Sequence, residues 1–349
     1  MLNVNKFAKH WSMHTRKMQG FSILELMIAI SLSLFLMLAV YKVFDVQQRA
    51  FEIIGALNDR EDNAQLALSV LAENIRMADY WGGVDLQQVQ HIKGGLSVFP
   101  GGCNASWIFK LSQGVFGLEG ESLVESIQNL PGNCLRNTDY VANSDLLALR
   151  FGNSHEYFHE NEIDNKRYQK HYFLRAQAGR SANLFQGKDL ALAIQAIPDK
   201  GFHYNMLFNS SLFFLRPCKQ ALHGCEEGNS VLTRLILKGD RYIQEALVEG
   251  IEQLQFEYGF DENSDNVVDR YVIANNVTDW QKVLSVRIFI LVRGHLKDKS
   301  IDENGKQYVM SSTASKNSNI YSVPAQDRFY PRKLYQSEVA IRNRLLKAN

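Results

Sequence analysis

GFSILELMIAISLSLFLMLAVY, residues 20–41, is the stretch around which the chain is organised. A helix needs roughly 20 apolar residues to cross a bilayer core, and residues 21–41 supply that length. Glu25 is the one charged residue in the run. A carboxylate at the centre of such a helix costs on the order of 2.5–3.5 kcal/mol, and less near an end. Glu25 therefore needs a positive partner, which a cut after Gly20 would create by freeing the α-amine of Phe21.

The residues before this run are basic, with Lys6, Lys9, Arg16 and Lys17 and no acid. A basic flank stays on the cytoplasmic side of a membrane. A secretory signal peptide is cut after its apolar region, which is then discarded. Here the glycine comes before the apolar run, so we expect the apolar helix to be retained. An uncleaved signal anchor is the alternative.

The pattern of residues 20–27, G-F-S-I-L-E-L-M, resembles the class III signal shared by type IV prepilins and type II secretion pseudopilins. The resemblance implies that a prepilin peptidase removes the cytoplasmic leader 1–20 by cutting between Gly20 and Phe21. It also implies N-methylation of Phe21. In such proteins the acid at the position of Glu25 pairs with the amine of a neighbouring subunit during assembly.

The composition excludes one class of partner and points to disulfides. The formal net charge is +1, and no basic cluster lies outside the leader, so we expect no nucleic-acid binding. An even number of cysteines beyond a membrane segment fits two disulfides in an oxidising compartment. Short loops close at the least entropic cost, which favours the pairings Cys103–Cys134 and Cys218–Cys225 among the three that are possible. Reduced, buried thiols are the alternative.

The apolar helix is predicted to continue beyond the membrane to about residue 80. Small and apolar residues recur there at helical spacing, with Glu61 as the one charged interruption, and Gly82-Gly83 marks the stop. A helix over 21–80 would be about 90 Å long. Its second half would pack on a globular head, although a separate second helix fits the same pattern. The apolar stripe is Ala50, Ile54, Leu57, Ala64, Leu68, Leu71, Ile75 and Ala78.

Residues 76–83 read RMADYWGG and are similar to the R-x-A-G-Y-x-G-C run that ends this helix in type IV pilus minor pilins of the W type. Two positions depart from that run, because Asp79 replaces the usual Gly and Gly83 replaces the usual Cys. The family's disulfide pattern therefore does not carry over intact, and Cys103 would take the place of the missing partner.

The head, residues 81–349, reads mainly as closely spaced strands, which predicts an antiparallel sheet. One strand, 283–293, is apolar on both faces, so we expect cover on both sides. Residues 294–322 are polar and predict a loop or lid. Residues 329–345 resemble the closing strand of these pilins, which ends in a similar Arg-Asn pair, here Arg342-Asn343. The other predicted strands are 144–151, 170–176, 211–216, 231–238 and 251–260.

An acidic loop at 261–269 is a candidate calcium site. Oxygen-bearing side chains at Asp261, Asn263, Asp265 and Asp269 match the opening of a calcium loop. Val272 stands where an EF-hand has its bidentate glutamate, so a hydrated acidic hairpin turn is the alternative. The W-type pilins show a similar stretch between two tyrosines, here Tyr258 and Tyr271. We expect no other cofactor.

Residues 155–159, HEYFH, form a literal H-E-x-x-H motif. In zinc proteases His155 and His159 would bind the metal from one helical turn, and Glu156 would activate water. The flanking residues are polar and show no apolar helix, so a polar loop is the preferred interpretation and zinc is disfavoured.

Taken together, the resemblance implies an α+β, type IV pilin-like fold, in which a long N-terminal helix packs on an antiparallel head. It implies a minor pilin, not an enzyme, that sits in the inner membrane by a single pass with its head in the periplasm. Its partners would be the prepilin peptidase, other minor pilins, the major pilin and a tip adhesin. It would act in a priming complex and then lie at the pilus tip or in the filament at the cell surface. The alternatives are a J-type type II secretion pseudopilin and, remotely, a membrane-tethered zinc hydrolase.

Overall fold

The computed structural model describes residues 20–91, 103–132, 134–198, 202–218, 228–312 and 320–345. The leader residues 1–19 and Cys225 lie outside this range. The chain divides into two compact units, Met1–Ile54 and Gly55–Asn349, which we describe separately.

The first unit contains the N-terminal part of helix α1 (Ile23–Met77). Ser22 caps the helix, because its carbonyl accepts the N–H of Leu26 at 3.1 Å and its hydroxyl accepts the N–H of Leu24 at 3.3 Å. Glu25 lies in the first turn, where the helix dipole favours an acid. By length and composition α1 is the one helix in the described chain that could span a membrane, and its most apolar window has no buried residue.

In the second unit, α1 buries a stripe of small residues in the main core. Small side chains allow a close approach between the helix and the strands. Of the predicted stripe, Ala64, Leu71, Ile75 and Ala78 are buried, whereas Ala50, Ile54 and Leu57 are exposed. The stripe was therefore predicted too far toward the N-terminus, while Ala67 and Ala72 were missed.

The larger sheet of the head has eight strands in the order β1-β5-β4-β6-β3-β2, with β7 on β6 and β8 on β7. All its pairs are antiparallel except β1 with β5. One face contributes to the core under α1 and the other to a second core around Trp81. The strands are β1 (Val89–His91), β2 (Val115–Leu118), β3 (Leu146–Phe158), β4 (Tyr172–Gln177), β5 (Ser181–Gln186), β6 (Tyr204–Pro217), β7 (Ser230–Lys238) and β8 (Arg241–Glu249).

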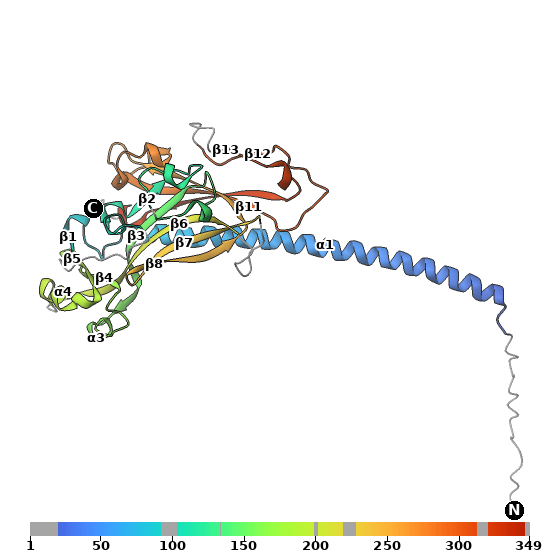
Figure 1. Ribbon diagram of the computed structural model, residues 1–349, viewed down its shortest axis with the longest axis horizontal. Coiled ribbons are helices and arrows are strands. Elements are labelled where there is room, and N and C mark those ends of the chain that lie inside the picture. The colour runs from blue at the N-terminus through green and yellow to red at the C-terminus, as the bar shows by residue number, and fades with distance from the viewer. Residues whose placement is uncertain are drawn as a thin grey trace, which may run out of the picture. The chain divides into compact units, whose positions relative to one another are not determined.

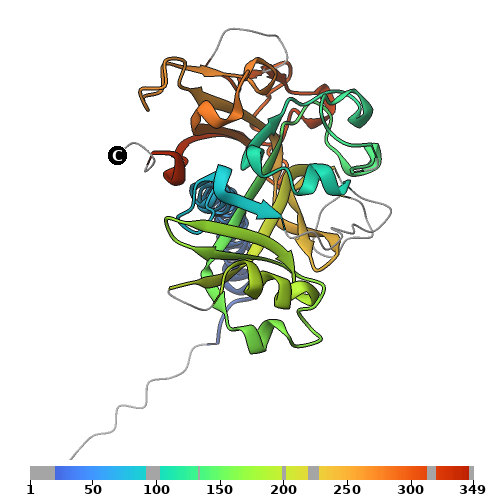
Figure 2. The same cartoon turned by 90° about the vertical axis from the view of Figure 1, so that its left-hand side faces the viewer.

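The smaller sheet has four antiparallel strands in the order β10-β9-β11-β14. They are β9 (Ile251–Phe260), β10 (Arg270–Val272), β11 (Val283–Arg293) and β14 (Arg332–Ala340). A two-stranded sheet of β12 (Gln307–Val309) and β13 (Ile320–Ser322) lies against its outer face. Figure 2 shows the strands of the head in a second view.

Strand β11 has cover on both sides, as predicted. Alternate residues such as Val286 and Ile288 enter the main core. Phe289 and Leu291 on the other face pack against Tyr308 of the predicted lid segment. This segment contains two short strands and is therefore not only a loop.

Three short α-helices lie between described strands (Figure 1), namely α2 (Ala105–Ile108), α3 (Glu160–Ile163) and α4 (Leu190–Ala196). A fourth, α5 (Arg342–Leu345), follows β14. A long N-terminal helix whose second part packs on antiparallel sheets confirms the α+β, pilin-like fold class.

Candidate assembly segment and helix–head junction

The residues predicted for processing and assembly lie at the start of α1. Phe21 is 83% exposed, Gly20 is exposed, and Glu25 is exposed one turn further on. No hydrogen bond or ion pair of Glu25 is found among the described residues. The apolar side chains that follow are exposed throughout Ile23–Ile54, so within its own unit this segment has no core to enter. Such a surface needs a lipid bilayer or other helices as its surroundings.

At the other end of α1, Asp79 holds the junction with the head. Its backbone has a φ of 64°, the left-handed region in which the resembling pilins carry glycine. Its carboxylate accepts the indole N–H of Trp81 at 3.0 Å and the Nε–H of Arg344 at 2.9 Å. The departure from the family run thus places a buried ion pair at the helix end.

The C-terminal helix α5 caps α1. The Asn343 side-chain amide donates to carbonyls at the end of α1, at 3.2 Å to Met77, its last residue, and at 3.0 Å to Ala78, which follows it. Arg344 also donates to the carbonyl of Val283 at 2.7 Å, which ties α5 to β11. The Arg342-Asn343 pair was predicted only as an end mark of the closing strand. Its capping role could not be read from the sequence, because 265 residues separate Asn343 from Ala78.

Two buried charges in apolar strands were missed by the sequence reasoning. Arg150 is fully buried and donates to the carbonyls of Trp107, Ile108 and Gln113 at 2.8, 2.9 and 2.6 Å. Burial lowers its pKa to about 10. Glu257 is 1% exposed and accepts the N–H of Ser312 at 2.7 Å. A charge inside an apolar run, as in LLALRF and LQFEYGF, is the sequence signal that could have marked them.

The acidic loop has the contacts of a hairpin turn. Asp261 accepts the N–H groups of Ser264 at 2.6 Å and Asn266 at 2.9 Å, and Asp269 accepts that of Glu262 at 2.7 Å. Asn263 and Asp265 are hydrogen-bonded to each other. Among the described residues, no group of three or more His, Cys, Asp or Glu side chains is placed to hold a metal. These hydrogen bonds therefore support the interpretation as an acidic hairpin turn, and they do not support a calcium site.

The flanking tyrosines frame this turn as a β9–β10 hairpin. Tyr258 pairs with Val272 and Gly259 with Tyr271 in the strand register. Gly259 is required there, because an added Cβ would lie 2.3 Å from the hydroxyl of Ser285. The Tyr271 hydroxyl is hydrogen-bonded to the same hydroxyl at 3.0 Å.

The H-E-x-x-H motif does not form a zinc site. His155 lies in β3, and His159 follows the end of that strand and begins α3. Four residues along a strand span about 13 Å, whereas zinc ligands at this spacing need a helical turn. His155 instead lies 3.5 Å from the carboxylate of Glu73. The polar-loop prediction was also wrong, because β3 is longer than its apolar part.

The first predicted disulfide, Cys103–Cys134, is confirmed. Both residues are buried in the second core. Cys218 is disulfide-bonded as well.

Comparison with known proteins agrees with the sequence resemblance. Residues 224–343 match the family model of the type IV pilus-assembly protein W. Residues 15–41 match the prokaryotic N-terminal methylation motif. None of the curated proteins matches the chain significantly.

Among solved structures, a type IV-like pilin from Thermus thermophilus aligns with 81% of this chain and 95% of its own, at 11% identity and a TM-score of 0.33. The two family matches confirm the resemblance to type IV pilus minor pilins of the W type.

Proposed function

We propose that the chain is made as a prepilin, is cut after Gly20, and works with other minor pilins in a complex that primes type IV pilus assembly. The leader would be residues 1–20, the long helix 21–80 and the periplasmic head 81–349. The protein would span the inner membrane once before it enters the pilus tip or filament, where it would contact the major pilin and a tip adhesin.

One observation carries this proposal. A methylation-type start, a Glu25 without a partner among the described residues and an apolar helical segment exposed over Ile23–Ile54 occur in the same chain as a match to a pilus-assembly family. Once helices stack side by side in lipid, the amine of Phe21 and the carboxylate of a neighbouring Glu25 would neutralise each other. A polar pair in a low-dielectric medium is favoured over two separate charges.

The first experiment is the N-terminal mass of the protein purified from membranes. The expected chain starts at methylated Phe21, and Gly20→Ala should leave a precursor heavier by the leader. A start at Met1 in the unchanged protein would contradict processing.

The second experiment tests the pairing of Glu25. Glu25→Ala should still be cut but should be several-fold depleted in the sheared pilus fraction. Glu52→Ala, an exposed acid further along α1, is the matched control and should assemble normally. Equal amounts of both variants in filaments would rule out the role of Glu25.

A J-type secretion pseudopilin shares the start and the helix. The family match over residues 224–343 favours the pilus. Recovery of the protein in sheared pili, and not in a secretion-system fraction, would support this choice.

A further inference from the structure

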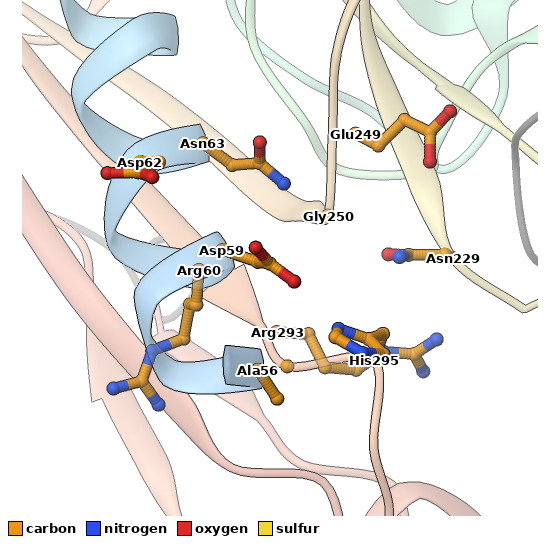
Figure 3. Close-up of a pocket in the computed structure, with 11 residues that line it drawn as sticks. Ala56, Asp59, Arg60, Asp62, Asn63, Asn229, Glu249, Gly250, Arg293 and His295 are labelled. Atoms are coloured by element: carbon orange, nitrogen blue, oxygen red, sulfur yellow. The ribbon is translucent and has the colours of Figure 1, made fainter. Parts of the chain in front are cut away.

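A polar cavity of about 420 Å³ opens in the head unit beside the first turns of α1 that belong to it (Figure 3). Its walls come from α1, from the β8–β9 turn at Gly250 and from the end of β11. In Figure 3 the Asp59 and Asn63 side chains point from α1 into this space, toward Asn229 on the far side. They are four residues apart and so lie on one face of the helix. The polar cavity is thus formed by segments distant in the sequence.

The charged side chains around the cavity differ in whether they face it and whether they already have partners. Asp59 makes no hydrogen bond or ion pair within the described ranges, although it faces the cavity. Arg60 and Asp62 also line the cavity, but in Figure 3 the ends of their side chains point away from Asn229. The guanidinium of Arg293 lies 3.4 Å from Asp327 and 4.5 Å over the ring of Tyr330, so its charge is already balanced.

The remaining groups complete a mixed lining. Glu249 adds a second carboxylate at the rim, and His295 closes the lower side. The Nε–H of Arg293, which is 7% exposed, has no acceptor among the described residues. That N–H is covered by protein atoms, so the group that the lining offers to a guest is the exposed carboxylate of Asp59.

The volume is many times the roughly 30 Å³ of one water and within the range of ligand pockets. A lone ion would leave most of it empty, and a purely anionic ligand would meet Asp59 and Glu249. A long basic side chain fits better, because its cationic end suits Asp59 and its hydrocarbon stem fills part of the remaining volume. We propose that the polar cavity receives an arginine or lysine of a neighbouring pilus subunit. This inference rests on the proposed function, which supplies the neighbour.

The chemistry is tested on the full-length protein in detergent micelles with two small probes. Nα-acetyl-arginine methylamide carries the cation, and Nα-acetyl-citrulline methylamide has the same shape without the charge. Saturation transfer from the protein should be roughly threefold or more stronger to the arginine probe, the size expected for one exposed charge pair. Asp59→Asn should remove this preference, and Glu73→Gln, an exposed acid on the same helix that does not line the cavity, should keep it.

Equal transfer to the two probes would overturn the proposal. So would a preference that survives Asp59→Asn, because the cation would then bind elsewhere.

The neighbour is tested in cells with a photo-crosslinking amino acid at position 229. The expected adduct joins a basic segment of a second protein that carries a prepilin signal, and Asp59→Lys should abolish it. No adduct, an adduct with another copy of this chain, or one with a protein lacking that signal would each overturn the proposal. The N-terminal mass distinguishes failure of this inference from failure of the proposed function. A chain that starts at methylated Phe21 but shows no preference for the arginine probe would contradict only the binding role of the cavity. A start at Met1 would contradict the minor-pilin function itself.

Discussion

The ion pair between Asp79 and Arg344 is buried at both ends, with side chains 0% and 3% exposed. Removing one member of such a pair leaves an uncompensated charge, which typically costs about 3–5 kcal/mol. We predict a loss of this size in the free energy of unfolding for Asp79→Asn, since asparagine tolerates the positive φ and removes only the charge. Denaturant titration of the purified protein measures it.

Glu73→Gln is the control for this prediction. Glu73 lies on α1, six residues before Asp79, but is exposed, so its loss should change the free energy of unfolding by less than about 0.5 kcal/mol. If Asp79→Asn and Glu73→Gln unfold at the same denaturant concentration, the Asp79–Arg344 pair does not stabilise the fold by the predicted amount.

Two glycines should respond oppositely to alanine. At Gly117 an added Cβ would lie 1.9 Å from the hydroxyl of Tyr258, which is fully buried and has no room to move. Overpacking of this kind costs about 1–3 kcal/mol, so Gly117→Ala should lower the melting temperature.

At Gly55, inside α1, an added Cβ meets nothing within 4 Å. Gly55→Ala should stabilise the helix by about 0.5–1 kcal/mol, and a loss there would contradict the helical contact pattern.

Among the elements, the segment between β11 and β14 is held on the smaller sheet through Glu257. This carboxylate accepts the hydroxyl of Ser311 at 2.5 Å and the N–H of Ser312 at 2.7 Å. Glu257→Gln replaces one accepting oxygen by a donor, so we predict faster tryptic cleavage at the exposed Lys299. Cleavage rates in limited proteolysis test this. Glu338→Gln is the control. Glu338 and Glu257 both lie beside Arg287, so this variant also removes an acid from Arg287, but it leaves Ser311 and Ser312 bound to Glu257.

At the same scale, the sequence predicted the elements whose pattern is local. The strands 251–260 and 283–293 were predicted with their observed bounds, because apolar and β-branched residues fill them. Strand β8 was missed, since as an edge strand it is largely exposed and its residues, RYIQEALVE, alternate poorly. Strand β3 was cut short at Phe151 because its second half is polar. Local pattern thus found long buried strands, but it missed the short strands β2 and β5 although both are buried.

The candidate assembly site can be predicted from the sequence only because its residues lie in one short segment. Gly20, Phe21 and Glu25 stand within six residues, so a linear motif identifies them. The Asp79–Arg344 pair joins residues 265 positions apart, and the polar cavity combines four separate segments. Contacts of that kind depend on the register of the sheets, which no single-sequence pattern specifies.

At the scale of the whole molecule, two acids should give the head a stability profile with opposite slopes in different pH ranges. Burial raises the pKa of Glu160, but hydrogen bonds from Arg175 at 2.7 Å and His203 at 3.1 Å outweigh it and lower the pKa from 4.5 to about 2. Its contribution is present above pH 4.5 and is lost as the pH falls toward 2, by about 2 kcal/mol after allowance for partial exposure.

Asp145 acts in the other direction. Burial and the nearby Glu119 raise its pKa well above 3.8, so the folded head holds this proton more tightly than the unfolded chain does. Stability should therefore rise as the pH falls through the pKa of folded Asp145, and then decline below about pH 4.5 as Glu160 is protonated. Urea unfolding between neutral pH and about pH 2 should show this maximum. Asp145→Asn should flatten only the upper limb and Glu160→Gln only the lower one. A profile in which either substitution alters both limbs equally would mean that other acids govern the pH response.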